Sequence, residues 1–107
     1  MLYIEEFIIE TLALVRPLVV VISGRDDNLG KQIVRAASSI ALNVAEGACS
    51  QGRNEQARYY SALGSANETL CGLKLAVAWG YIPAPDAQLM DRFQRTIATL
   101  KSLSRRR

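Results

Sequence analysis

Three clusters of turn-forming residues constrain the fold of this chain more than any other feature. They lie at 23–27, 47–53 and 80–85, and they divide the 107 residues into four segments of helical length. Connections this short place successive helices side by side in opposite directions, so the division predicts an all-α, antiparallel up-down-up-down four-helix bundle. We expect one domain over 1–104 and a disordered basic tail at 105–107.

Apolar residues at alternating intervals of three and four predict one buried face for each segment. The expected core rows are Ile4, Phe7, Ile8, Leu12 and Val15, then Leu29, Ile33, Ala37, Ile40 and Val44, then Tyr59, Leu63, Ala66, Leu70, Leu73 and Val77, and finally Leu89, Phe93, Ile97, Leu100 and Leu103. The third row is the most regular, and its spacing is typical of helices that pack along their whole length.

Residues at the segment ends predict where the helices begin and end. Asp26 or Asp27 is a suitable N-cap for the second helix, and Gly47 would end it in the left-handed conformation. Gly80 would end the third helix in the same way. Pro85 fits the first turn of the fourth helix, where no backbone N–H is needed.

The second half of the first segment is apolar on nearly all sides. Pro17 should kink this helix, and residues 18–22 carry no polar side chain. A helix of that kind needs cover from more than its own bundle, so we expect a second subunit to pack against it. The alternative is a β-strand at 19–22, because short β-branched runs fit either structure.

Residue composition argues against an enzyme. The chain has no histidine, the commonest general base, and Cys49 and Cys71 lack the spacing of a metal site. We therefore expect no cofactor, no metal and two free thiols. An enzyme would need a cleft in which carboxylates such as Glu46 and Glu68 have raised pKa values.

The N-terminal segment indicates where the protein resides. It begins with acidic residues where a signal peptide would be basic. The longest apolar stretch, 12–22, is interrupted by Arg16 and Pro17 and is shorter than the ~20 residues that cross a bilayer. We therefore expect a cytoplasmic protein without a membrane partner.

Polar residues on the second and third segments form matched pairs when the two helices are laid antiparallel. Residues at equal height then have numbers that sum to about 103. The predicted pairs are Arg35 with Glu68, Ser39 with Gly64 and Ser65, Asn43 with Tyr60, and Glu46 with Arg58. We interpret them as structural contacts that set helix register. The alternatives are a catalytic or ligand site and contacts with a partner.

Aromatic residues near the helix ends have two interpretations. Tyr59, Tyr60, Trp79 and Tyr81 could stack on nucleic-acid bases. At these positions, packing in the core and at helix ends is the more common role. We therefore expect them to be structural.

Basic residues concentrate on the fourth segment. The chain has a formal charge of +3 and a pI of about 9.1, which is compatible with RNA or DNA as a partner. The candidate nucleic-acid-binding residues are Arg92, Arg95, Lys101, Arg105, Arg106 and Arg107. The alternative is a solvated helix face with a disordered end.

Three stretches resemble the bacterial four-helix bundle proteins encoded in intervening sequences of large-subunit ribosomal RNA genes. The first, 32–47, reads QIVRAASSIALNVAEG, the second, 62–68, reads ALGSANE, and the third, 80–82, reads GYI. A relative is the accessory variability determinant of diversity-generating retroelements. Position by position, the family's signature falls on Arg35, Ser39, Asn43, Glu46, Gly47, Gly64, Ser65 and Glu68. The first helix departs from the family pattern.

This resemblance implies an up-down-up-down bundle that assembles as a homo-oligomeric ring, a pentamer in characterised relatives. In the retroelement protein the basic surface engages nucleic acid and the reverse transcriptase. Two hypotheses for this chain follow: a non-enzymatic oligomer that binds nucleic acid or a ribonucleoprotein, and a protein-binding or scaffolding oligomer with no nucleic-acid role.

Overall fold

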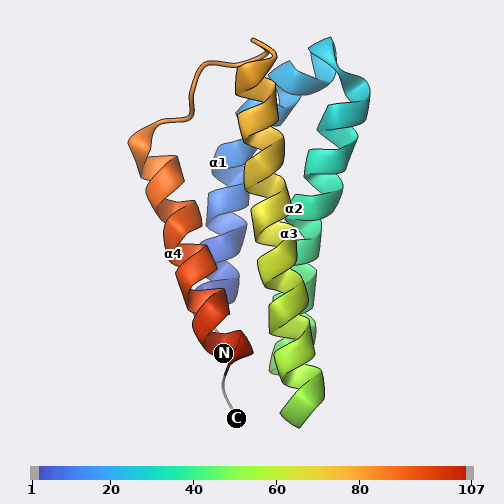
Figure 1. Cartoon of the computed structure of the whole chain (residues 1–107), viewed down its shortest axis with the longest axis vertical. Coiled ribbons are helices and arrows are strands. Elements are labelled where there is room, and N and C mark those ends of the chain that lie inside the picture. Colours follow the sequence, from blue (N-terminus) through green and yellow to red (C-terminus); the bar gives the residue numbers. More distant parts are fainter. Residues whose placement is uncertain (1–2, 106–107) are drawn as a thin grey trace.

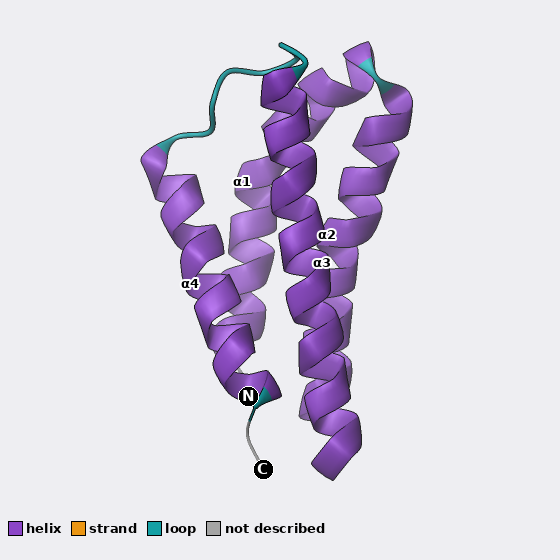
Figure 2. Ribbon diagram, viewed as in Figure 1, coloured by secondary structure: helices purple, strands orange, loops and turns teal. Residues whose placement is uncertain are grey.

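Four antiparallel helices make up the protein in a computed structural model that describes residues 3–105. They are α1 (Tyr3–Arg25), α2 (Asp27–Ala48), α3 (Gly52–Ala78) and α4 (Ala87–Ser104), with no strand among the described residues (Figures 1 and 2). The all-α four-helix bundle expected from the sequence is confirmed.

The helices form an elongated bundle of 42 × 25 × 20 Å in which consecutive helices pack together and α4 returns to α1. The α1 helix begins, and α4 ends, at the lower end of Figure 1, where α2 also meets α3. Every residue of the four expected rows is either buried or packed against the core, except that Phe7 stacks on arginine side chains instead. The periodicity therefore identified the core correctly.

Two aspartates define the starts of α2 and α4. Asp26 is the only residue between α1 and α2, and its carboxylate accepts a hydrogen bond of 3.0 Å from the backbone N–H of Leu29. Asp86 caps α4 in the same way, with 2.8 Å to the N–H of Leu89. Each cap satisfies a backbone donor that the helix itself leaves free. Pro85 therefore precedes the cap, and the prediction that it lies in the first turn is wrong.

The two glycines expected to end helices behave differently. Gly80 has a φ of +76°, and the N–H of Tyr81 bonds back to the Ala76 carbonyl at 2.8 Å, as in a Schellman turn. Gly47 lies inside α2 without a left-handed φ, so that prediction is wrong. Its role is steric, because a Cβ there would lie 2.8 Å from the ring of Tyr59.

The first segment is one continuous helix, so the β-strand alternative for 19–22 is wrong. Pro17 lies inside α1 and does not end it. Ile8, Val15 and Ile22 are buried, whereas the opposite side of the helix is exposed and mostly apolar. By length and composition α1 passes the test for a membrane-spanning helix, which the core helix of a soluble protein passes as well.

Small residues bring α2 and α3 into close contact. A Cβ at Gly72 would lie 2.6 Å from the Cγ1 atom of Ile33, which leaves no room for a side chain. The hydroxyl of Ser65 donates a hydrogen bond of 2.9 Å to that of Ser39, as the register argument predicted. Gly64 faces outward and nothing lies within 4 Å of a Cβ built there, so its expected role in this contact is wrong.

The charged pairs expected between α2 and α3 divide into one that forms and one that does not. Glu46 and Arg58 make an ion pair of 3.1 Å, as predicted. Arg35 and Glu68 are both exposed, and the described residues include no ion pair between them. Asn43 donates to the carbonyl and hydroxyl of Ser39, each at 2.9 Å. The predicted alignment of α2 with α3 is therefore correct. It does not ensure that two long, exposed side chains at equal height form an ion pair.

Candidate nucleic-acid interface

Arg92 was expected in the basic surface, but it is a structural residue. Its Nε atom donates to the Thr11 hydroxyl at 2.8 Å, and Nη2 donates to the Phe7 carbonyl at 3.0 Å and to Glu10 at 3.3 Å. The guanidinium also lies 4.0 Å from the centre of the Phe7 ring, and the side chain is only 17% exposed. Most donors of this guanidinium bond within the molecule, so we leave Arg92 out of the candidate interface.

The remaining cations of α4 point to two different sides of the helix. At about 100° per residue, Arg95 and Lys101 lie about 120° apart around the axis. Arg95 faces α1, where it lies 5.4 Å from the Phe7 ring and 3.9 Å from Asp91. Lys101 and Arg105 are exposed on the side toward α3. Arg106 and Arg107, the last two residues of the expected tail, lie outside the described residues.

A row of exposed residues on α3 lies on the same side of the bundle as Lys101. Arg53, Tyr60, Asn67 and Lys74 recur every seven residues, so they follow one line along the helix. The Tyr60 side chain is 69% exposed, which is unusual for an aromatic residue without a partner. The seven-residue spacing was present in the sequence, but the buried row beside it was the stronger signal.

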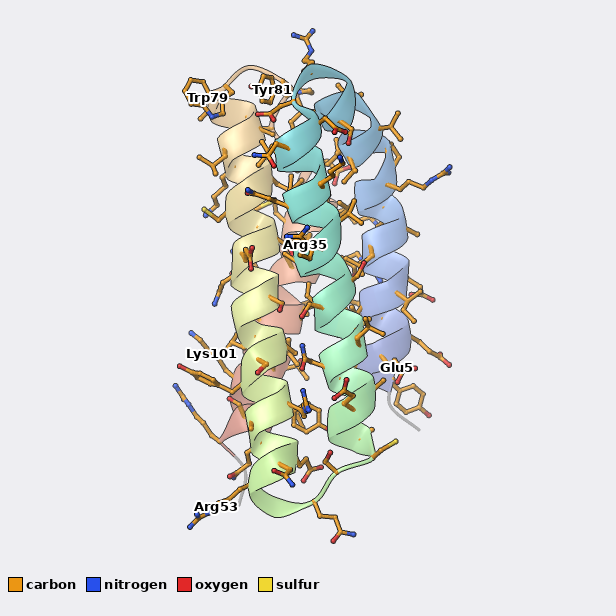
Figure 3. All side chains as sticks on the ribbon, turned by 90° about the vertical axis from the view of Figure 1, so that its right-hand side faces the viewer. Glu5, Arg35, Arg53, Trp79, Tyr81 and Lys101 are labelled. Carbon is orange, nitrogen blue, oxygen red and sulfur yellow. The ribbon has the colours of Figure 1, made fainter. Side chains whose placement is uncertain are left out.

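The α3 row runs along most of that helix, and Lys101 lies beside its lower part. Because α3 and α4 are antiparallel neighbours, the end of α4 lies beside the start of α3 (Figure 1). Figure 3 shows Arg53 and Lys101 on the same side of the bundle, away from Glu5. We define the α3–α4 basic face by its seven exposed members: Arg53, Tyr60, Asn67, Lys74, Gln94, Lys101 and Arg105.

Acidic residues of these two helices lie on other sides. Glu55 and Glu68 are turned about 90° or more from the basic row of α3. Asp91 makes its ion pair with Arg95 on α4 and with none of the cations of the basic face. None of the four cations of the basic face has an ion pair among the described residues. Cations, an exposed ring and two amides therefore share a surface without a competing acid.

An apolar cleft adjoins the upper end of this face. It has a volume of about 250 Å³ and lies between α3, α4 and the loop that joins them, with Lys74, Pro85 and Met90 among its walls. This volume is below the ~300–1,000 Å³ of typical small-molecule pockets. No group of three His, Cys, Asp or Glu residues suited to a metal occurs in the described part of the chain.

The two thiols and the remaining aromatic residues are not members of the basic face, although Cys71 neighbours Asn67 and Lys74 on α3. Cys49 and Cys71 are free and exposed. Tyr81 packs at the upper end of the bundle, where its hydroxyl donates to Asp26 at 3.2 Å. Trp79 is 69% exposed beside it, so its expected packing against the helix end leaves most of the side chain uncovered (Figure 3).

Comparison with known proteins places the chain in a family. Residues 20–102 match the family model for 23S rRNA-intervening sequence proteins. The chain belongs to this family. The match excludes most of the first helix, the segment in which the sequence departs from the family pattern. Among curated proteins, none matches the chain.

A solved structure shares the family's bundle. It is the crystal structure of a protein with unknown function from the S23 ribosomal protein family of Bacteroides thetaiotaomicron, with 23% identity and a TM-score of 0.78. The likeness covers 96% of this chain and 99% of that one, so the whole fold is shared, α1 included. At this identity the likeness concerns the fold alone.

Proposed function

We propose that the protein is a non-enzymatic, cytoplasmic, self-associating bundle that binds nucleic acid through the α3–α4 basic face. The observation that carries this proposal is the composition of that face: four exposed, unpaired cations surround an exposed tyrosine, and no acid intervenes. The cations can pair with the phosphates of a nucleic-acid backbone, and unstacked bases can pack on the tyrosine ring. The matched family takes its name from intervening sequences of 23S rRNA, and we take RNA as the first ligand to test.

The dimensions of the face fit an extended polyanion. Arg53 and Lys74 are separated by about 31 Å along α3 at 1.5 Å per residue. This length equals about nine phosphates of one duplex strand. The face therefore contacts a backbone along the bundle axis and does not enclose a single nucleotide.

Self-association strengthens a face that is weak alone. Four contacts give a modest affinity at physiological salt, but linked copies bind at a high effective concentration. Exposed apolar side chains on α1, including Ile9 and Val20, support association of the bundles. They also favour the alternative function, a protein-binding scaffold without a nucleic-acid role.

The experiment is a titration of fluorescent structured RNA, single-stranded RNA and duplex DNA with the protein at several salt concentrations. The wild type should bind with a steep dependence on salt, close to one released counterion for each phosphate contact. Replacing Lys101 or Arg53 with alanine should weaken binding to every sequence and lower the salt slope by about 1.

Arg95→Ala is the matched control, because Arg95 is an exposed arginine of the same helix on the side toward α1. Its binding should stay within about twofold of the wild type if the basic face is the interface. Loss of binding in Arg95→Ala with normal binding in Lys101→Ala would overturn the proposed face. If the wild type binds neither RNA nor DNA at low salt, the nucleic-acid function is excluded and the protein-binding scaffold is the remaining proposal.

A further inference from the structure

The outward side of α1 has a complementary surface on the outward side of α3. Ile9, Ala13, Arg16 and Val20 follow one line along α1 at intervals of four and three residues. All are exposed, Ile9 by 54% and Val20 by 63%. Arg16 is the only charged residue of α1 between Glu10 and Arg25. We call this line the α1 stripe.

Seven exposed residues on α3 recur at the same alternating intervals, which are typical of a helix that packs against another. This α3 stripe consists of Ala57, Ser61, Gly64, Glu68, Cys71, Leu75 and Ala78. Most of its members are small, and Glu68 is its only charge. Glycine inside a helix costs about 1 kcal/mol relative to alanine, and nothing within the molecule requires it at position 64.

The height of Arg16 along the bundle follows from the contact between α1 and α2. A Cβ on Gly30 would lie 3.0 Å from the Cβ of Ser23, so these two residues are level. Because the helices are antiparallel, equal steps along both place Arg16 level with Ala37.

The height of Glu68 follows from the contact between α2 and α3. Gly72 is level with Ile33, because a Cβ there would touch the Ile33 side chain. Equal steps in opposite directions then place Glu68 level with Ala37 as well. The single cation of the α1 stripe and the single anion of the α3 stripe therefore lie at one height, on helices that run in the same direction.

We propose that the α1 stripe of one copy packs in parallel against the α3 stripe of a second copy, with Arg16 paired to Glu68 across the contact. This proposal rests on the self-association that the proposed function includes, and it identifies the surfaces that associate. Aligning the two charges brings large side chains of α1 opposite small ones of α3. The facing pairs are Ile9 with Ser61, Ala13 with Gly64, Arg16 with Glu68, and Val20 with Cys71.

This pairing explains three features that a single copy does not explain. Arg16 and Glu68 have no ion-pair partner among the described residues. Apolar side chains of α1 are exposed, and Gly64 lacks a side chain where a monomer would have room for one. A lipid surface would also cover apolar residues of α1, but it would not account for the unpaired Glu68 or for a glycine at position 64.

The first experiment measures mass in solution for the wild type, Arg16→Glu, Glu68→Arg and the double variant. Each single reversal places like charges in contact and should weaken association by about tenfold or more, and the double variant should restore it. Circular dichroism checks that each variant is folded. A multimeric wild type whose mass neither reversal changes, or a double variant that remains dissociated, would overturn the pairing while leaving self-association intact.

A mixing experiment tests whether the two surfaces are different. Val20→Glu blocks the α1 stripe and Ser61→Trp blocks the α3 stripe, so each variant alone should be monomeric. Their mixture should form a one-to-one dimer, because each supplies the surface that the other lacks. A multimer of either variant alone would contradict the proposal.

Two outcomes of the wild-type measurements separate the remaining possibilities. A wild type that stays monomeric at all concentrations would remove self-association, and nucleic-acid binding would then be judged by the salt titration alone. A monomer that floats with vesicles of phosphatidylcholine and phosphatidylglycerol would identify lipid as the cover of the α1 stripe and overturn the proposed contact.

Discussion

The guanidinium of Arg92 joins α4 to α1 through Phe7, with a hydrogen bond of 3.0 Å to its carbonyl and a stack 4.0 Å from its ring centre. Because Arg92 is mostly buried and bonds to three groups, Arg92→Ala should lower the free energy of unfolding by about 2 kcal/mol.

Urea denaturation followed by circular dichroism measures this change. The control is Arg95→Ala, whose exposed side chain makes a looser ion pair and should change stability by less than about 0.5 kcal/mol. Equal effects of the two substitutions would contradict a structural role for Arg92.

Two glycines of α3 should respond to alanine with opposite signs. Gly72→Ala places a methyl group 2.6 Å from Ile33 and should destabilise the bundle by about 1–3 kcal/mol. Gly64→Ala meets open space in a single copy and should stabilise the monomer by about 1 kcal/mol. Thermal unfolding at a concentration where the protein is monomeric compares them, and a stable Gly72→Ala variant would show that α2 and α3 are less closely packed.

Stability should fall at alkaline pH because of Tyr81. Partial burial, and then the charge of Asp26 and the hydrogen bond to it, raise the pKa of Tyr81 above its ordinary value of 10.0. The folded protein thus holds this proton more tightly than the unfolded chain, so the contribution is fully present below pH 10 and is lost as the pH rises through the folded pKa. Urea midpoints between pH 8 and 11 should show a steeper decline for the wild type than for Tyr81→Phe, which has no proton to lose.

Tyr60 should contribute to binding by stacking. Tyr60→Ala should weaken binding to single-stranded RNA by about 1–3 kcal/mol, whereas Tyr60→Phe keeps the ring and should bind almost normally. Fluorescence anisotropy at fixed salt measures both. Equal losses for the two variants would point to the hydroxyl group, and no loss for either would remove Tyr60 from the interface.

Local patterns in the sequence determined the helices and the core. Periodic apolar residues and strong end signals such as Asp26 and Gly80 act over a few residues, so a single chain segment carries all the information needed. The antiparallel order followed from the short connections, and it predicted the contacts of Ser39 with Ser65 and of Glu46 with Arg58.

Only the tertiary structure decided which polar side chains are available at the surface. Arg92 and Lys101 look alike in a linear sequence, yet the rotation of α4 turns Arg92 onto Phe7 and leaves Lys101 beside the basic row of α3. Gly47 has the sequence context of a helix end, yet its position is set by the ring of Tyr59 packed against it. The sequence determines which residues repeat along each helix, but the angle and height at which helices meet depend on the packing of all four, and these set the candidate interface.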